Sequence, residues 1–337
     1  MNNILVTGGA GFIGSNFIKL VLNSRKYKII NYDKLTYAGN IENLKGLYDF
    51  PNYNFELGDI CDSKHLEEII NKYEIDTIVN FAAESHVDRS ILSAAPFLET
   101  NVNGTVVLLQ IANKYKIQRF LQVSTDEVYG SANVDETFDE NSNLAPNSPY
   151  SASKASADLF VRAFNKTYGT PTIITRSSNN YGPYQYPEKL IPLVITKALN
   201  NEKIPVYGDG MNIRDWIYVD DNCQAILTVL ENGNEGEIYN ISANNEKTNL
   251  DIIRQILNFL GKSEDLISFV KDRPGHDRRY SISSKKLTET LKWKPNTDFD
   301  TGIKKTIVWY RTHLKWLVDI QKKQNYIDYY NKQYLIK

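Results

Sequence analysis

Two adjacent carboxylic acids, Asp126 and Glu127, follow an apolar run of the chain, and a hydroxyl residue, Thr125, precedes them. Tyr150 and Lys154 stand four residues apart further along. Two carboxyls held close together push their pKa values apart, so one can act as an acid and the other as a base. Residues four apart share one face of a helix, where the Lys154 ammonium would lower the phenol pKa and make Tyr150 a usable general base. These side chains predict an acid–base centre.

The elements around these residues decide whether they act together. Residues 120–124 are typical of a buried strand, whose carboxyl end would carry Thr125 and the two acids. Open α/β sheets bind their ligands at that edge, and residues 150–168 predict a helix after it. The alternative interpretation is a pair of solvated acids on a turn. The position at a strand end favours the catalytic interpretation.

The start of the chain predicts a dinucleotide site. An apolar run at residues 4–7 is followed by glycines at positions 8, 11 and 14 and by an amphipathic stretch at residues 15–23. This order indicates a strand, a tight turn and a helix whose N-terminus binds a pyrophosphate. A second strand at residues 28–32 ends at Asp33, which would hydrogen-bond the adenosine ribose and repel a 2′-phosphate. NAD is favoured over NADP, although the neighbouring Lys34 keeps NADP open.

The rest of the chain predicts a sheet of several parallel strands. Further apolar runs at residues 54–57 and 77–81 alternate with helical patterns at residues 63–72 and 97–114. The expected fold class is α/β, a Rossmann-type doubly wound parallel sheet. Because loops become more frequent later, we expect a smaller C-terminal substrate-binding lobe. The expected parts, with a soft boundary between the first two, are residues 1–178 for the dinucleotide, residues 179–320 for the substrate and a tail at residues 321–337.

The composition excludes several classes of protein. The 337 residues include 39 Lys and Arg against 40 Asp and Glu, which leaves no broad field for nucleic acid or anionic lipid. Cys61 and Cys223 fit neither a disulfide framework nor metal-ligand spacing, so we expect no metal and a reducing compartment. No apolar run approaches the ~18 residues of a membrane span, and the first strand leaves no room for a signal peptide. We expect a cytoplasmic protein.

Several segments carry a family resemblance. The spacing of the three glycines, together with the Tyr–Lys pair, resembles the extended short-chain dehydrogenase/reductase superfamily. Residues 82–90, 124–130 and 179–192 are similar to the dTDP-glucose 4,6-dehydratases within it, and the resemblance extends to about residue 310. Simple sugar-nucleotide epimerases of this superfamily carry small or neutral residues in place of the two adjacent acids. The resemblance also implies a chain that crosses between its lobes more than once.

The resemblance implies a complete reaction. Tyr150, helped by Lys154 and Thr125, would remove the O4 proton of the sugar as a hydride passes from C4 to NAD. Because the resulting ketone acidifies the C5–H bond, Glu127 would take that proton while a protonated Asp126 donates to the departing 6-hydroxyl. Water would leave as an enone forms, after which the hydride would return to C6 and C5 would be reprotonated. The product would be a 4-keto-6-deoxy sugar nucleotide that feeds deoxysugar biosynthesis, such as that of rhamnose.

The patterns above and the resemblance together predict two sets of binding residues. The cofactor set comprises Gly8, Gly11, Phe12, Ile13, Gly14, Asp33, Lys34, Asp59, Ile60, Ala82, Ala83, Ser124, Tyr150, Lys154 and Asn179. The set for a nucleoside diphosphate glucose comprises His86, Thr125, Asn180, Lys189, Leu190, Tyr207, Arg214, Asn249, Arg273, His276 and Tyr280. Arg214 and Arg273 are expected to face the pyrophosphate, because guanidinium groups match phosphate oxygens.

Other functions stay open at this point. A UDP-glucose 4,6-dehydratase needs only a slightly different base pocket. A sugar-nucleotide 4-epimerase shares every feature except a use for the two adjacent acids. A protein that senses NAD without turnover would not need Tyr150, Lys154 and Thr125 in register.

The resemblance further implies a homodimer in which the helices at residues 97–114 and 150–168 pair across a two-fold axis. The second helix has small residues that permit close approach beside larger apolar ones: Ala152, Ala155, Ala157 and Ala163 beside Leu159, Phe160 and Phe164. After Asp300 an apolar pattern through Leu317 predicts a helix packed on the body. Residues 321–337 form either a peripheral helix or a loosely held tail.

Overall fold

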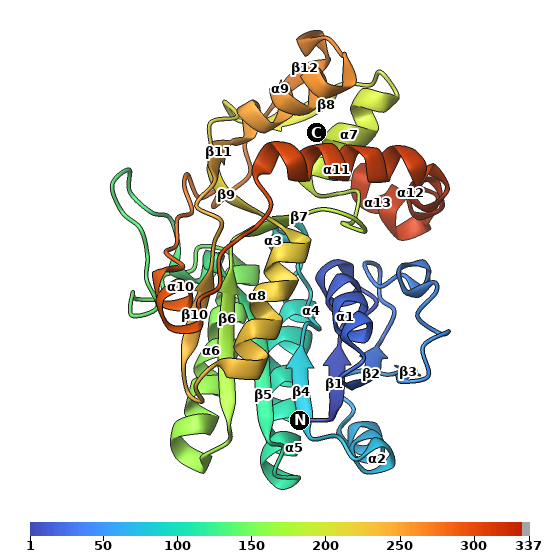
Figure 1. Cartoon of the computed structure of the whole chain (residues 1–337). Coiled ribbons are helices and arrows are strands. Elements are labelled where there is room, and N and C mark those ends of the chain that lie inside the picture. Colours follow the sequence, from blue (N-terminus) through green and yellow to red (C-terminus); the bar gives the residue numbers. More distant parts are fainter. Residues whose placement is uncertain (332–337) are drawn as a thin grey trace.

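The structure is a computed structural model that describes residues 1–331 of the chain. Within these residues the central feature is a seven-stranded sheet in the order β10-β6-β5-β4-β1-β2-β3, with every neighbouring pair parallel (Figure 1). Its strands are β1 (Asn3–Thr7), β2 (Lys28–Asp33), β3 (Tyr53–Leu57), β4 (Thr77–Asn80), β5 (Arg119–Thr125), β6 (Thr172–Ser177) and β10 (Ile238–Ile241). The order extends from β1 in both directions, so the predicted doubly wound α/β class is confirmed.

Helices cover both faces of this sheet. Successive strand residues point to opposite sides, so Val6 packs on one face and Leu5 on the other. The first face is covered by α1 (Phe12–Ser24) and α8 (Val219–Asn232), and the second by α2 (Ser63–Tyr73), α5 (Thr105–Lys114) and α6 (Pro149–Tyr168). Burial on both faces explains why these strands are continuous apolar runs rather than alternating ones.

One predicted helix differs from the structure. The pattern at residues 97–114 predicts a single α-helix, but the chain forms a short helix α4 (Ala95–Phe97), a π-helical stretch η2 (Leu98–Gly104) and then α5. A π-helical turn accommodates an extra residue and changes which side chains share a face. Thr100, within this stretch, lines the cavity described below.

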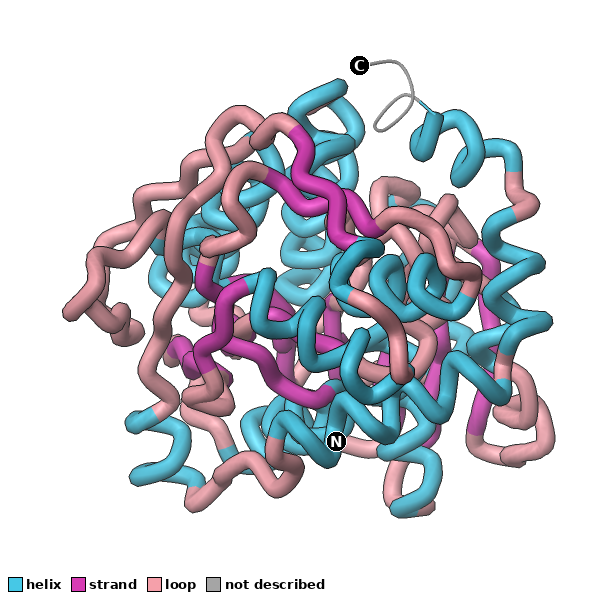
Figure 2. The backbone as a smooth tube through the Cα atoms, turned by 90° about the horizontal axis from the view of Figure 1, so that it is seen from above, coloured by secondary structure: helices cyan, strands magenta, loops and turns pink. Residues whose placement is uncertain are grey.

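A smaller lobe lies over the carboxyl ends of the central strands (Figures 1 and 2). It contains a three-stranded sheet in the order β11-β9-β7 and a parallel pair, β8 with β12. Its elements are β7 (Asn179–Tyr181), α7 (Leu190–Leu199), β8 (Ile204–Tyr207), β9 (Ile213–Tyr218), β11 (Glu246–Thr248), α9 (Asn249–Leu260) and β12 (Ile267–Val270). A separate apolar core, which includes Trp216 and Ile253, holds this lobe together.

The chain passes between the two lobes more than once. β10, well beyond residue 178, adds the edge strand next to β6, and α8 packs on α1. A short helix, α10 (Lys285–Leu291), packs against β10. Because the segment after residue 178 supplies parts of both lobes, a division at that residue stays a prediction.

The end of the described chain forms several helices instead of the predicted single one. α11 (Phe299–Thr312) and α12 (Leu314–Gln321) are separated at His313, and α13 (Gln324–Tyr330) follows them. The single-helix prediction was wrong because the backbone of His313 leaves the helical conformation (φ −117°, ψ 37°). As a result Leu314 is exposed, and the buried face of α12 begins at Trp316. The predicted tail therefore begins as a helix, and residues 332–337 lie outside the described residues. The remaining short elements are η1 (Ile41–Leu44), α3 (Val87–Leu92), η3 (Asp126–Tyr129) and η4 (Glu264–Leu266).

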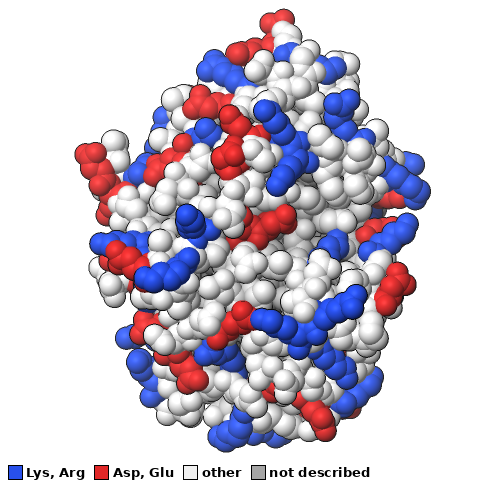
Figure 3. Space-filling view, viewed as in Figure 1, with Lys and Arg blue, Asp and Glu red and all other residues white. Residues whose placement is uncertain are grey.

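Acidic and basic side chains are intermingled on the face drawn in Figure 3. This distribution agrees with the formal net charge of −1. Among residues 1–331, we find no helix that combines the length and the apolar character needed to cross a membrane.

Candidate active site

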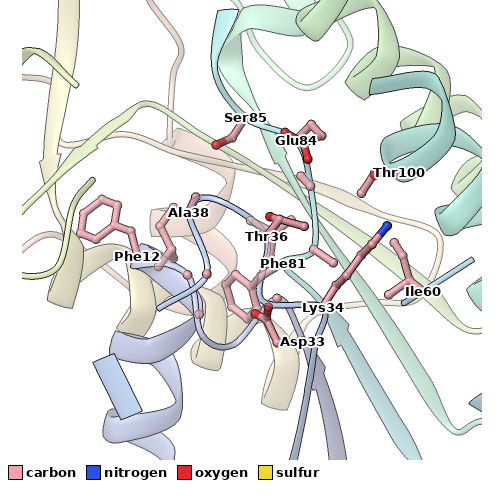
Figure 4. Close-up of a pocket in the computed structure, with 18 of the residues that line it drawn as sticks. Phe12, Asp33, Lys34, Thr36, Ala38, Ile60, Phe81, Glu84, Ser85 and Thr100 are labelled. Carbon is pink, nitrogen blue, oxygen red and sulfur yellow. The ribbon is translucent and has the colours of Figure 1, made fainter. Parts of the chain in front are cut away.

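A cavity opens at the carboxyl edge of the central sheet, below the small lobe (Figure 4). It brings together nearly all of the predicted cofactor residues, which come from the ends of β1 to β5 and from α1 and α6. Those that line it are Gly8, Gly11, Phe12, Ile13, Gly14, Asp33, Lys34, Asp59, Ile60, Ala82, Ala83, Ser124, Tyr150 and Lys154. Asn179 is the exception, because it lies in β7 outside this lining.

The glycine turn after β1 has the geometry that a dinucleotide phosphate requires. Gly8 has a φ of +70°, and a Cβ there would lie 2.5 Å from the Ala82 backbone nitrogen. A Cβ on Gly14 would lie 2.5 Å from the Gly8 carbonyl oxygen, so the first turn of α1 can pack closely on the loop. Gly11 begins α1 without a side-chain cap. The first N–H groups of α1 thus lack a side-chain acceptor, and a pyrophosphate would fit them.

Asp33 is more deeply embedded than the sequence suggests. Its Oδ2 accepts from the Ala10 N–H at 2.8 Å and its Oδ1 from the Leu35 N–H at 2.7 Å. These bonds fix the turns after β1 and β2 against each other. Burial raises the pKa of the Asp33 carboxyl, and the two backbone N–H groups oppose that shift. The neighbouring Lys34 forms an ion pair with Asp59, so its charge is partly neutralised.

The cavity also has a wall that the sequence reasoning missed. The loop after β2 supplies Thr36, Ala38 and Gly39, and the π-helical stretch supplies Thr100 (Figure 4). Other lining residues that were not predicted are Tyr32, Gly58, Phe81, Glu84, Ser85, Val123, Tyr184, Gln185 and Tyr186. The residues of the loop after β2 show no periodicity, so the sequence did not indicate that this loop lines the cavity. Gly39 was the available clue, because a Cβ there would lie 2.9 Å from Asp33 Oδ1.

The two adjacent acids lie in a tight turn at the end of β5. The Thr125 hydroxyl donates to Asp126 Oδ1 at 3.2 Å and accepts from the Glu127 N–H at 3.3 Å, so Thr125 caps η3. Asp126 is buried and Glu127 is partly exposed. Asp126 Oδ2 is buried with no hydrogen-bond partner among the described residues. Neither Thr125 nor either acid is part of the cavity lining, but the turn follows Ser124, which is. It leaves one Asp126 oxygen available to a ligand.

The environments of the two acids differ in the way that an acid–base pair requires. Burial raises the pKa of Asp126 well above its usual range, and the nearby Glu127 raises it further. Burial also raises the pKa of Glu127, but Arg273, Arg214 and Lys189 oppose that shift. Asp126 is thus the group that retains a proton and Glu127 the group that ionises first.

Tyr150 and Lys154 lie side by side in α6 but do not show the predicted pKa effect. The sequence predicts that Lys154 lowers the phenol pKa. In the structure burial raises the pKa of Tyr150, Glu127 adds to the increase, and the Thr125 side chain partly offsets it. The Lys154 Nζ instead donates to the Val123 carbonyl at 2.7 Å, and burial lowers the pKa of Lys154 to about 8.

The small lobe places cationic groups opposite Glu127. Arg214 comes from β9, and its guanidinium lies 4.1 Å from the centre of the Tyr280 ring. Arg273 follows β12, and its Nη1 donates to Asp88 Oδ1 at 2.8 Å. Lys189 precedes α7, and its Nζ donates to the Ser85 carbonyl at 2.9 Å. All three cations act to lower the pKa of Glu127, so the two predicted pyrophosphate ligands, Arg214 and Arg273, lie near this acid.

The other predicted substrate residues have mixed surroundings. Burial lowers the pKa of His86 and of His276 to about 4, so both imidazoles are neutral near pH 7. The His276 ring lies edge-on to that of Tyr207. The remaining members lie in the small lobe: Asn180 in the middle of β7, Leu190 at the start of α7 and Asn249 at the start of α9.

Comparison with known proteins identifies relatives that match most of this chain. Residues 5–306 match the family described as GDP-mannose 4,6 dehydratase. The chain is 48% identical to a dTDP-glucose 4,6-dehydratase from Shigella flexneri, with 94% of this chain and 95% of that protein covered. Two solved structures are similar to it. One is a dTDP-glucose 4,6-dehydratase from Bacillus anthracis in complex with NAD (51% identity, TM-score 0.90, covering 95% of this chain and 100% of that one). The other is the dTDP-glucose 4,6-dehydratase DesIV from Streptomyces venezuelae with NAD and TYD bound. It has 46% identity and a TM-score of 0.92, and the match covers 94% of this chain and 99% of that one.

Proposed function

Because the chain belongs to the GDP-mannose 4,6 dehydratase family, we propose that it is a hydro-lyase that converts dTDP-glucose to the 4-keto-6-deoxy sugar nucleotide, with NAD as its cofactor. Relatives with this activity match nearly the whole chain at 46–51% identity. The observation that carries the proposal is the pair Asp126 and Glu127, held together at the end of β5. Burial raises both pKa values, but only at Glu127 do nearby cations oppose the shift strongly. An epimerase of the same fold has no step that uses this pair.

The residues present fit the dinucleotide. The uncapped N-terminus of α1 would hold the pyrophosphate, Asp33 would face the adenosine ribose, and the wall formed by Thr36 and Gly39 would close over it. NAD supplies a hydride acceptor for C4 and a hydride donor for C6. Since Lys34 is paired with Asp59, the site offers little to a 2′-phosphate, and NAD is favoured over NADP.

Tyr150, Lys154 and Thr125 serve the oxidation at C4. Tyr150 accepts the O4 proton, and Thr125 orients the reacting oxygen from the end of β5. Because burial raises the phenol pKa, Tyr150 becomes an effective base only when a positive charge lies beside it. The Lys154 ammonium, one helical turn away on α6, is the cation that can supply it by turning from the Val123 carbonyl.

Glu127 and Asp126 serve the removal of water. Glu127 takes the proton from C5, which the neighbouring ketone has made acidic. Asp126, whose raised pKa keeps it protonated, donates its own proton to the 6-hydroxyl, which leaves as water while a double bond forms between C5 and C6. Arg214, which is buried, and Arg273, which is partly buried, bind the diphosphate, since guanidinium groups pair well with phosphate oxygens.

We also propose a homodimer. Several apolar side chains are exposed on neighbouring elements of one side of the chain: Ile91, Leu92, Leu98, Leu159 and Phe160. On α6, Ala152 and Ala163 are exposed in line with Leu159, so close helix approach is available there. Ala155 and Ala157 are buried within the chain and take no part in this face, contrary to the sequence expectation. A cytoplasmic location stays a prediction.

The test of the proposed function is direct. Purified protein is given dTDP-glucose in deuterated solvent, with UDP-glucose in a parallel reaction. We expect a 4-keto-6-deoxy product that carries solvent deuterium at C5, formed faster from the dTDP sugar. Formation of the C4 epimer without loss of water would contradict the proposal.

A further inference from the structure

Asp88 connects separate parts of the chain through one buried carboxylate. Its Oδ1 accepts a hydrogen bond from Arg273 Nη1 at 2.8 Å. Its Oδ2 accepts from the hydroxyls of Tyr207 at 3.1 Å and Tyr329 at 3.2 Å. Asp88 belongs to α3, Tyr207 and Arg273 to the small lobe, and Tyr329 to α13. Both oxygens of this carboxylate are therefore held by groups from distant segments.

Arg273, which donates to Asp88, is the residue that we expect to bind the diphosphate. Its Nε is buried and has no hydrogen-bond partner among residues 1–331. A buried guanidinium donor needs an acceptor, and a phosphate oxygen beside Glu127 would provide one. Since Asp88 holds Arg273 through Nη1, it determines where the remaining donors of the guanidinium point.

The helix α13 is fixed on this carboxylate by several contacts. The Tyr329 ring lies edge-on to His86 at 5.1 Å and 4.4 Å from the Arg89 guanidinium. One turn earlier, Tyr326 packs against Tyr186, a residue of the cavity lining. Because residues three apart share a face of a helix, the same side of α13 contacts both the cofactor wall and the substrate side. The Tyr329 hydroxyl is its link to Asp88.

We propose that α13 contributes to substrate binding. Tyr329 and Asp88 are positioning residues, which orient Arg273 and Tyr207 for the diphosphate of the sugar nucleotide. The inference rests on the proposed function and names the elements that set affinity at the same site. Loss of the Tyr329 hydroxyl leaves its ring contacts in place but loosens the Asp88 carboxylate. Substrate binding then weakens, while proton transfer at Glu127 continues in the substrate that binds.

The experiment compares Tyr329→Phe with a matched control, Tyr326→Phe, which removes a hydroxyl from the same helix without touching Asp88. We measure kcat and KM for dTDP-glucose, and Kd for thymidine diphosphate by titration calorimetry. We expect Tyr329→Phe to raise KM and Kd by roughly fivefold and Asp88→Asn by roughly tenfold or more, as for lost hydrogen bonds to charged groups. The value of kcat should stay within about twofold, because the transition-state contacts remain. NAD content and melting temperature should equal those of the control.

A double variant makes the test specific. If Tyr329 acts through Asp88, Tyr329→Phe adds nothing further to Asp88→Asn, whereas independent effects add. Additive effects, or a Tyr329→Phe protein that matches the Tyr326→Phe control, would overturn the inference. If Asp88→Asn does not fold, the comparison of the two tyrosine variants decides alone.

The failure of the proposed function is recognised separately. A wild-type protein that does not convert dTDP-glucose refutes that function, yet the Kd values for thymidine diphosphate still decide the role of Tyr329. A wild-type protein that does not bind thymidine diphosphate refutes the inference itself.

Discussion

Replacement of each acid by its carboxamide, Glu127→Gln and Asp126→Asn, should separate oxidation from loss of water. The carboxamides fill the same space at the end of β5, so the turn capped by Thr125 can form in both variants. Neither can exchange a proton. A positioned acid or base contributes typically about 10²–10⁴-fold to a rate, which corresponds to about 2.7–5.4 kcal/mol of barrier. We expect the upper part of this range for Asp126→Asn, because the site of Asp126 is buried and water replaces its proton poorly.

The assay follows the reduced cofactor after a single addition of dTDP-glucose. In both carboxamide variants oxidation at C4 remains possible, so the absorbance of reduced nicotinamide should appear and persist. Glu127→Gln should also slow the entry of solvent deuterium at C5, whereas Asp126→Asn should mainly slow loss of the 6-hydroxyl. Tyr150→Phe is the control in which oxidation itself is blocked. It removes the base for the first step, so no reduced cofactor should appear.

The pH dependence supplies an independent readout. Activity requires Glu127 ionised and Asp126 protonated. As pH falls through the pKa of Glu127, which burial raises above its usual range, activity is lost. As pH rises through the raised pKa of Asp126, activity is lost again. The loss of activity at low pH should disappear in Glu127→Gln, because glutamine does not take up a proton there. The reasoning would be refuted if both carboxamide variants formed the 4-keto-6-deoxy product at near wild-type rates.

Three further predictions concern the cofactor and the assembly. Gly14→Ala should lower NAD content and melting temperature, because its Cβ would lie 2.5 Å from the Gly8 carbonyl oxygen; a variant that keeps its NAD contradicts the close packing of α1. Asp33→Ala should narrow the preference for NAD over NADP, measured by titration, and should also destabilise the fold by about 1–3 kcal/mol, because two backbone N–H groups lose their acceptor. If the wild-type protein bound NADP with the same affinity as NAD, the role assigned to Asp33 would be refuted. Leu159→Glu combined with Phe160→Glu should shift light scattering from dimer to monomer, since both exposed side chains lie on α6; an unchanged dimer would place the interface elsewhere.

The local parts of the site could be predicted from the sequence because short spacings fix them. A strand followed by glycines at 8, 11 and 14 has few conformations available, and it positions a helix N-terminus for phosphate. The acids after β5 and the Tyr–Lys pair on α6 also depend on one element each. Buried strands that are apolar on both faces likewise predicted the doubly wound sheet.

Tertiary structure alone decided how distant residues meet. The Arg273 and Tyr329 partners of Asp88 lie 185 and 241 residues away in sequence, and no periodicity encodes such a contact. The pKa of Tyr150 also depends on burial by several elements and on the direction of the Lys154 ammonium, which the four-residue spacing does not set. Spacing determines which side chains share a strand end or a helix face. Desolvation and the convergence of separate segments determine their charge and their partners, because both arise only when the lobes pack together.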